Sequence, residues 1–270
     1  MSKSNLIVRR IIESVEDMNR SYPFLSSFNI STLAEDDMMF FMEKMIDMQE
    51  FYRSKGYNHY IDTGYHHTKP KNMTSIRTEG LMSNYERLGR KARKRLTFGD
   101  GIYTGNYPDS FTEYGSVGLI VARLQGNIFW VPTNCIIALP HVHRSLLEES
   151  NTIIGNKMTS HGKRPVEDEA DECVLKCSSQ CVPLIQYDVE VIRKQSGAKQ
   201  VIRFIQELIQ NILDEELNSG CIPQHRSERK PVESSLFVPH HIQSTLTLSG
   251  NRLWHRKSDF VHRREMFQQL

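Results

Sequence analysis

Apolar residues in the first 56 positions recur at spacings close to the helical period. A helix is predicted over residues 4–20 by five apolar positions, Leu6, Ile7, Ile11, Ile12 and Val15. A second helix is predicted to begin near Ser31 or Thr32, because Thr32 and Glu35 match a capping box, and to run to about Arg53. We therefore expect a helical N-terminal extension over residues 1–56.

Between residues 57 and 195 the pattern changes to short apolar runs separated by glycine, proline and polar residues. The run 117–124, VGLIVARL, predicts a buried strand. Residues 126–140 predict two strands around a proline turn, and 173–175 with 182–189 predict another pair of strands. A short helix is expected from Asn72 to Leu81, closed by Gly80. This pattern indicates an α+β domain with a mixed or antiparallel sheet flanked by helices.

The C-terminal quarter contains one strong pattern followed by a weak one. Residues 196–220 predict an amphipathic helix with apolar residues on one face. We expect helix 199–217 to offer a surface to a partner. Residues 221–270 are polar and basic without a sustained period, which favours a weakly ordered tail.

Composition and charge exclude several classes of protein. The 34 Lys and Arg residues nearly balance 32 Asp and Glu residues, so no strong overall field attracts nucleic acid or membranes. No apolar run is long enough for a membrane span, and the N-terminus lacks a signal-peptide core. Five cysteines favour reduced thiols, and we expect an intracellular protein, nuclear or cytoplasmic. Cys173, Cys177 and Cys181 lack the paired spacing of zinc ligands, so no metal is expected.

A basic block over residues 86–96 admits three interpretations. It is most simply a solvated face, but it also fits a phosphate-contacting loop or a nuclear-import signal. No aromatic residues are interleaved with these charges, so a nucleic-acid partner stays open but unsupported.

The candidate catalytic and ligand-binding residues lie in and around residues 98–105, FGDGIYTG. Gly99 and Gly101 straddle Asp100 and allow a ligand to approach the main chain closely. Upstream are His66, His67 and Thr68, and downstream an acidic cluster from Glu167 to Glu172 opens a strand. Each of these features alone is more often structural than functional.

Taken in order, these pieces resemble the catalytic domain of the poly(ADP-ribose) polymerase family of ADP-ribosyltransferases. The matching segments are 66–68, Ile76 with 79–81, 98–103 and 171–175. The likeness covers about residues 60–190, so a catalytic domain is expected over 57–195. It implies an ADP-ribosyltransferase-like split sheet and NAD+ as substrate, with ADP-ribose moved to a protein or nucleic-acid acceptor.

The resemblance also implies roles for individual residues. Glu172 matches the catalytic glutamate, and Glu169 is the next carboxylate to consider. His66 matches the histidine that hydrogen-bonds the adenosine ribose, and Thr68 is expected to assist it. Tyr103 matches the tyrosine that stacks on nicotinamide. Tyr114 matches a second stacking tyrosine, and Gly101 is expected to lie near the bound cofactor.

Two positions depart from the family pattern. His67 replaces the glycine whose backbone holds the nicotinamide carboxamide. Phe111 stands three residues before Tyr114, where a serine is expected, and Ser110 lies one position away. Both departures favour weaker or altered use of NAD+.

Three functions are therefore weighed. The first is an NAD+-dependent ADP-ribosyltransferase, with single or repeated transfer undecided. The second is a catalytically weak or inactive module that binds NAD+ or ADP-ribose and serves interactions. The third is an NAD+-dependent RNA 2′-phosphotransferase, which requires pocket arginines that the sequence does not place near His66.

Overall fold

The structure is a computed structural model that describes residues 2–88, 99–130, 150–155, 172–195 and 197–221. The chain divides into two compact units, Met1–Ile222 and Pro223–Leu270. Every element below belongs to the first unit, which holds the segments predicted as helical extensions together with the sheet. Apart from its first residue, the predicted tail lies outside the described residues.

The described strands form one eight-stranded sheet in the order β1-β8-β4-β2-β3-β7-β6-β5. Neighbouring strands are antiparallel except β5 and β6, which are parallel. The strands are β1 Ser31–Thr32, β2 Ile61–Thr68, β3 Ile102–Gly105, β4 Val117–Leu124, β5 Ile128–Trp130, β6 Thr152–Gly155, β7 Glu172–Leu175 and β8 Cys181–Asp188.

Three long helices and several short ones complete the described elements. They are α1 Lys3–Ser21, α2 Glu35–Ser54, α3 Met73–Glu79, α4 Asn84–Leu88, α6 Val189–Lys194 and α7 Ala198–Glu216, with 3-10 turns η1 Pro23–Phe28, η2 Pro70–Asn72, η3 Thr112–Tyr114 and η5 Ser178–Gln180. None of the helices in the described ranges is long and apolar enough to cross a membrane.

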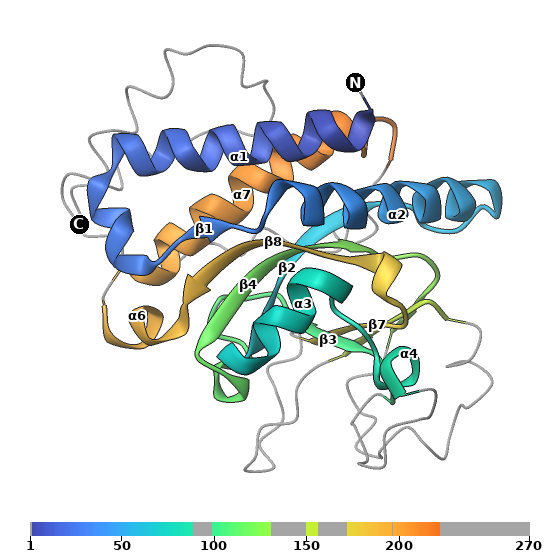
Figure 1. The fold of residues 1–270 in the computed structure, drawn as a ribbon. Coiled ribbons are helices and arrows are strands. Elements are labelled where there is room, and N and C mark those ends of the chain that lie inside the picture. The colour runs from blue at the N-terminus through green and yellow to red at the C-terminus, as the bar shows by residue number, and fades with distance from the viewer. Residues whose placement is uncertain (1, 89–98, 131–149, 156–171, 196, 222–270) are drawn as a thin grey trace, which may run out of the picture. The chain divides into compact units, whose positions relative to one another are not determined.

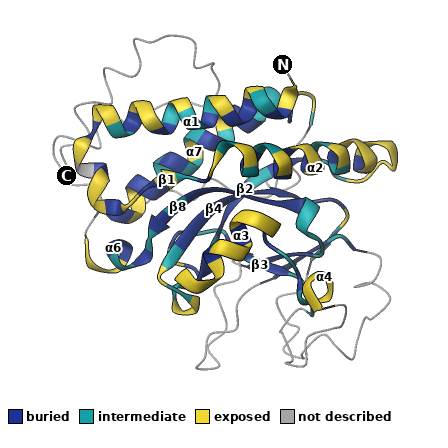
Figure 2. Cartoon of the chain, viewed as in Figure 1, coloured by how far each residue is buried: buried dark blue, intermediate teal, exposed yellow. Residues whose placement is uncertain are grey.

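The core lies between the sheet and the long helices. In Figure 1, α1, α2 and α7 lie together on one side of the sheet, and α3 lies on the other. Figure 2 shows the sheet-facing sides of the long helices buried and their outer sides exposed, as expected for amphipathic helices. β4 is buried along nearly its whole length, which matches the predicted strand at 117–124. These features confirm the predicted α+β class, with a mixed sheet flanked by helices.

The predicted start of the second helix is wrong. α2 begins at Glu35 after Ala34, which makes no side-chain cap hydrogen bond. Ser31 and Thr32 instead form β1, because they pair with Gln186 and Ile185 of β8. Pairing with a distant strand, which the local sequence does not reveal, therefore determines the structure of Ser31 and Thr32, and the capping-box match does not.

The apolar face of the predicted helix 199–217 is not open to a partner, whereas a partner at the outer face of this helix stays a prediction. α7 packs on β2 and α1, and its apolar residues are buried, namely Val201, Ile202, Ile205, Ile209, Ile212 and Leu213. Two glutamines of α7 also bond β2: Gln206 accepts from the Tyr65 hydroxyl at 2.7 Å, and Gln210 accepts from the Thr63 hydroxyl at 2.9 Å. The amphipathic pattern is real, but this chain itself covers the apolar face.

β2 pairs with its two neighbouring strands over different lengths. β2 pairs with β4 along all eight of its residues, whereas its register with β3 holds one pair, Tyr65 with Gly105. β2 and β3 therefore meet at this pair and diverge beyond it. The residues predicted to carry the chemistry lie around this junction.

Candidate active site

His66 lies in β2, beside the point where β2 and β3 diverge. Its Nδ1 is 2.8 Å from the carbonyl oxygen of Tyr103 in β3. Because a carbonyl only accepts, Nδ1 carries the hydrogen, and Nε2 of the neutral ring is an acceptor. Burial lowers the pKa of His66, which favours this neutral form at pH 7. His66 therefore presents one fixed tautomer at the junction.

Tyr103 and Glu172 lie on neighbouring strands and on one face of the sheet. β3 and β7 pair Tyr103 with Val174 and Gly105 with Glu172. Residues opposite each other in an antiparallel pair share a face, as do residues two apart in one strand. Glu172 is 6% exposed, so its carboxylate lies against the protein and not on an outer surface.

The Tyr103 ring is held from two sides. It packs on a small buried apolar cluster formed by Ile153 and Val174, and its hydroxyl donates to the carbonyl oxygen of Gly99 at 2.8 Å. The ring remains half-buried. The glycine-containing turn thus fixes the tip of the phenol in place.

Gly101 and Asp100 have structural roles in this turn. A Cβ on Gly101 would lie 2.5 Å from Cγ1 of Val174, so the close approach to β7 requires glycine. The Asp100 carboxylate accepts from the backbone N–H groups of Asn84 at 3.2 Å and Tyr85 at 2.8 Å, at the start of α4. Packing alone therefore accounts for the glycine at 101.

His67 fits into β2 because the strand opposite leaves room for it. It is paired with Gly118 of β4, and Gly118 lies under the ring of Tyr187. His67 Nε2 is 2.9 Å from the Tyr187 hydroxyl. Burial, with the neighbouring His66, lowers the pKa of His67 to about 4. The side chain is thus part of a buried pair with Tyr187.

The remaining predicted residues occupy different surroundings. Thr68 is buried, and its hydroxyl accepts from the Asn72 side-chain amide at 3.0 Å. Ser110 is buried over Gly105, beside the position of Glu172. Tyr114 is 59% exposed, and its ring centroid is 6.0 Å from that of Phe111. The structure therefore brings His66, Tyr103, Glu172 and Ser110 to one junction and places Tyr114 at its outer margin.

Some predicted features lie outside the described residues. These are Phe98, the acidic residues 167–171 with Glu169, and the part of the basic block from residue 89 onward. Within the described ranges, no group of three or more His, Cys, Asp or Glu side chains is placed to hold a metal ion.

Two residues near the junction were not singled out from the sequence. Tyr187 bonds His67 across β4, and Arg123 of β4 donates to the Thr104 hydroxyl of β3 at 3.2 Å. Both lie in runs that predict buried strands, and only the strand register reveals their partners. No local signal would have found them.

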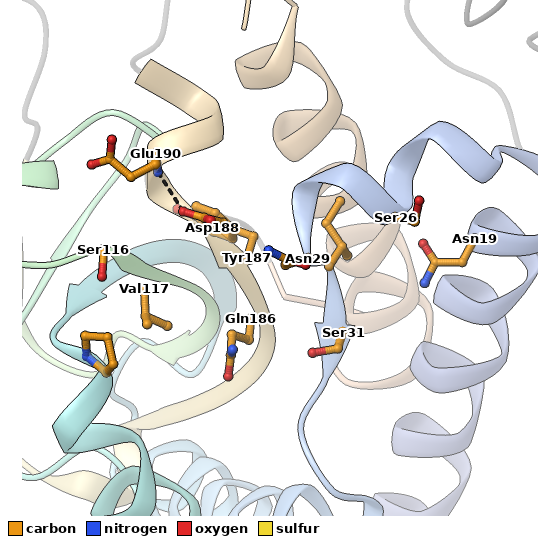
Figure 3. Close-up of a pocket in the computed structure, with 12 residues that line it drawn as sticks. Asn19, Ser26, Asn29, Ser31, Ser116, Val117, Gln186, Tyr187, Asp188 and Glu190 are labelled. Atoms are coloured by element: carbon orange, nitrogen blue, oxygen red, sulfur yellow. Dashed lines mark hydrogen bonds between the residues drawn. The ribbon is translucent and has the colours of Figure 1, made fainter. Parts of the chain in front are cut away.

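A pocket of about 800 Å³ lies away from the predicted residues, between the end of α1, η1 and the end of β8 (Figure 3). Its lining includes the polar side chains of Asn19, Asn29 and Gln186. Asp188 also lines it and accepts from the backbone N–H of Glu190 at 2.8 Å, at the start of α6. None of the predicted site residues lines this pocket, so it is separate from the junction.

Comparisons with known proteins find similarity to solved structures only. The sequence matches no protein-family model and no curated protein. Among solved structures, the chain is similar to the PARP domain of Arabidopsis RADICAL-INDUCED CELL DEATH1, with 10% identity and a TM-score of 0.39 over 59% of this chain and 84% of that chain. It is also similar to the TASOR pseudo-PARP domain, with 10% identity and a TM-score of 0.41 over 65% of this chain and 91% of that one.

Proposed function

We propose that the chain is an NAD+-dependent ADP-ribosyltransferase with its reacting centre at His66, Tyr103 and Glu172. The observation that carries this proposal is the position of these residues on three adjacent strands, where His66 bonds the main-chain carbonyl of Tyr103 and Glu172 is paired with Gly105, two residues from Tyr103. They are far apart in the sequence and match the family motifs in order. The acceptor is proposed to be a protein side chain.

Glu172 supplies the charge that the reaction requires. When the bond between nicotinamide and ribose breaks, nicotinamide leaves with the bonding electron pair and positive charge develops at the ribose carbon. A carboxylate held in a buried position stabilises that charge more than it would in water. Glu172 is proposed to fill this role and to orient the incoming acceptor, whose oxygen forms the new bond and releases its proton.

His66 is suited to hold the ribose of the adenosine half. Its Nδ1–H is committed to the Tyr103 carbonyl, so Nε2 accepts a hydrogen bond from a ribose hydroxyl. Thr68 lies two residues along β2 on the same face as His66. We assign both to the adenosine side of the ligand.

The nicotinamide side is proposed to lie over β3. Tyr103 offers its half-buried ring for stacking, with Tyr114 on the outer side. Ser110 and the backbone of His67 are proposed to hold the carboxamide, and Gly101 lies in the turn beneath. The His67 side chain does not interfere with binding of the carboxamide to the His67 backbone, because the side chain bonds the Tyr187 hydroxyl.

Automodification with labelled NAD+ tests this proposal. The full chain should incorporate label, and both Glu172→Gln and His66→Ala should reduce incorporation by about 100-fold or more. Glu16→Gln is a matched control, since Glu16 is an exposed acid on α1. Label that persists in both site variants would contradict the proposal.

A second function, an NAD+- or ADP-ribose-binding module without turnover, is favoured by one observation. Phe111 is 7% exposed, and its Cδ2 would lie 3.2 Å from a Cβ on Gly105. The phenylalanine thus stands against the face that carries Tyr103 and Glu172, at a position where the family has a serine. A chain that binds NAD+ but takes no label would support this alternative.

A further inference from the structure

The connection between β3 and β4, residues 106–116, lies over the junction. A Cβ on Gly105 would overlap Ser110 and approach Phe111, so both residues lie directly on this glycine. Gly105 is paired with Tyr65 on one side and with Glu172 on the other. Ser110 and Phe111 are each only 7% exposed. The segment therefore covers the same face of the sheet as Glu172.

Phe111 is held in a backbone conformation that phenylalanine rarely adopts. Its φ is +63°, in the left-handed region. Such a conformation persists only where the surroundings impose it. In this segment the imposed geometry buries the aromatic ring over Gly105.

The surroundings that hold the segment include three cations of α6 and α7. Each contacts a different residue of the segment: Lys199 Nζ lies 2.5 Å from Asp109 Oδ2, Arg203 lies 5.3 Å from the ring centroid of Tyr107, and Arg193 donates to the carbonyl oxygen of Thr112 at 2.6 Å. The Lys199 and Asp109 side chains are 47% and 43% exposed. Exposed ion pairs are individually weak and are screened by salt, so the Lys199–Asp109 contact can open.

We propose that residues 106–116 form a closing segment, in which Phe111 blocks the nicotinamide side of the site and the cations of α6 and α7 hold it shut. This proposal deepens the proposed function by naming what controls entry to the same site. Closing reduces the apparent affinity for NAD+ by the fraction of molecules that are open. Opening moves Phe111 off Gly105 and exposes the face that carries Tyr103 and Glu172.

Hydrogen exchange of the full chain tests the holding contacts without any ligand. Lys199→Gln removes the ion pair at the surface and leaves the core unchanged. Amides of residues 106–116 should exchange several-fold faster in this variant than in Lys44→Gln. Lys44 is a suitable control because it is an exposed lysine of α2 that lies over the ring of Phe40. Equal exchange in the two variants would overturn the holding role of α7.

Binding of NAD+ tests the blocking role. Phe111→Gly removes the ring and places glycine where φ is positive, so the backbone is retained. NAD+ affinity, measured by calorimetry, should rise about tenfold or more in this variant, and to a smaller degree in Lys199→Gln. Unchanged affinity in both variants of a chain that binds NAD+ would overturn the blocking role.

The exchange and affinity measurements distinguish a failure of the closing-segment proposal from a failure of the proposed function. The exchange measurement does not depend on NAD+, whereas the affinity measurement rests on the proposed function. Faster exchange in Lys199→Gln with no NAD+ binding by any variant would support a closing segment and refute the NAD+ site. Unchanged exchange together with NAD+ binding and turnover would refute the closing segment and leave the site intact.

Discussion

The buried pair of Arg123 and Asp62 provides a quantitative test of what joins the strands at the junction. Arg123 is 3% exposed, and its Nε and Nη2 donate to the two carboxylate oxygens of Asp62 at 2.8 and 2.7 Å. The same guanidinium donates to the Thr63 carbonyl oxygen at 2.9 Å and to the Thr104 hydroxyl at 3.2 Å. One side chain of β4 thus bonds both β2 and β3.

Asp62→Asn preserves the shape of the side chain and removes its charge. Burial by itself lowers the pKa of Arg123, but Asp62 outweighs this effect and the pKa is raised, so the guanidinium stays charged after the change. A buried cation left without its partner costs about 3–5 kcal/mol of unfolding free energy. Replacing the pair together, as Asp62→Leu with Arg123→Met, should cost less than Asp62→Asn alone, because no buried charge remains.

Urea unfolding followed by circular dichroism measures both variants. With a slope of about 2–3 kcal/mol per M, the midpoint of Asp62→Asn should fall by about 1–2 M. Asp17→Asn is the control, because its pair with Arg20 on α1 is exposed to solvent and should contribute little to stability. A cost below 1 kcal/mol for Asp62→Asn, or a double variant less stable than the single one, would refute the reasoning.

Three further outcomes follow from the buried groups near the site. Gly118→Ala should lower the free energy of unfolding by about 1–3 kcal/mol, because the new Cβ overlaps the Tyr187 ring; an unchanged urea midpoint would contradict this. The pKa of His67 is about 4 in the folded chain and about 6.5 unfolded. The unfolded chain therefore binds the extra proton between these values, and stability should fall by about 3 kcal/mol as pH drops from 6.5 to 4, a loss that His67→Gln should lack. Burial raises the pKa of Cys173 to about 11, so iodoacetamide at pH 8 should label it in urea but not in the native chain.

The elements that the sequence predicted well are those whose pattern is local. The apolar run at 117–124 coincides with β4 because that strand is buried on both faces. α7 follows from its helical period, and α3 ends at Gly80, which adopts a positive φ of 81°. In each case a short stretch of sequence contains the physical reason for the element.

What the sequence could not predict depends on partners far along the chain. β1 exists because β8 offers an edge to Ser31 and Thr32. The apolar face of α7 is buried because β2 and α1 cover it, which periodicity cannot distinguish from a surface for another protein. Tyr187 accommodates His67 only through the register of β4 and β8.

In the candidate site, too, some features could be predicted from local sequence motifs and others depend on distant contacts. Motif order predicted that His66, Tyr103 and Glu172 belong together, and the strand pairing places them on β2, β3 and β7. The position of Phe111 over Gly105 depends on an unusual backbone angle and on contacts from α6 and α7. No spacing rule contains that information.

Release of nicotinamide from NAD+ by the full chain tests the central claim most directly, because it reports cleavage of the bond at which Glu172 is proposed to act. We predict release above the uncatalysed rate in the wild type and in Glu16→Gln, and a loss of about 100-fold or more in Glu172→Gln. Equal release by the wild type and Glu172→Gln would contradict the claim that residue 172 stabilises the reacting centre.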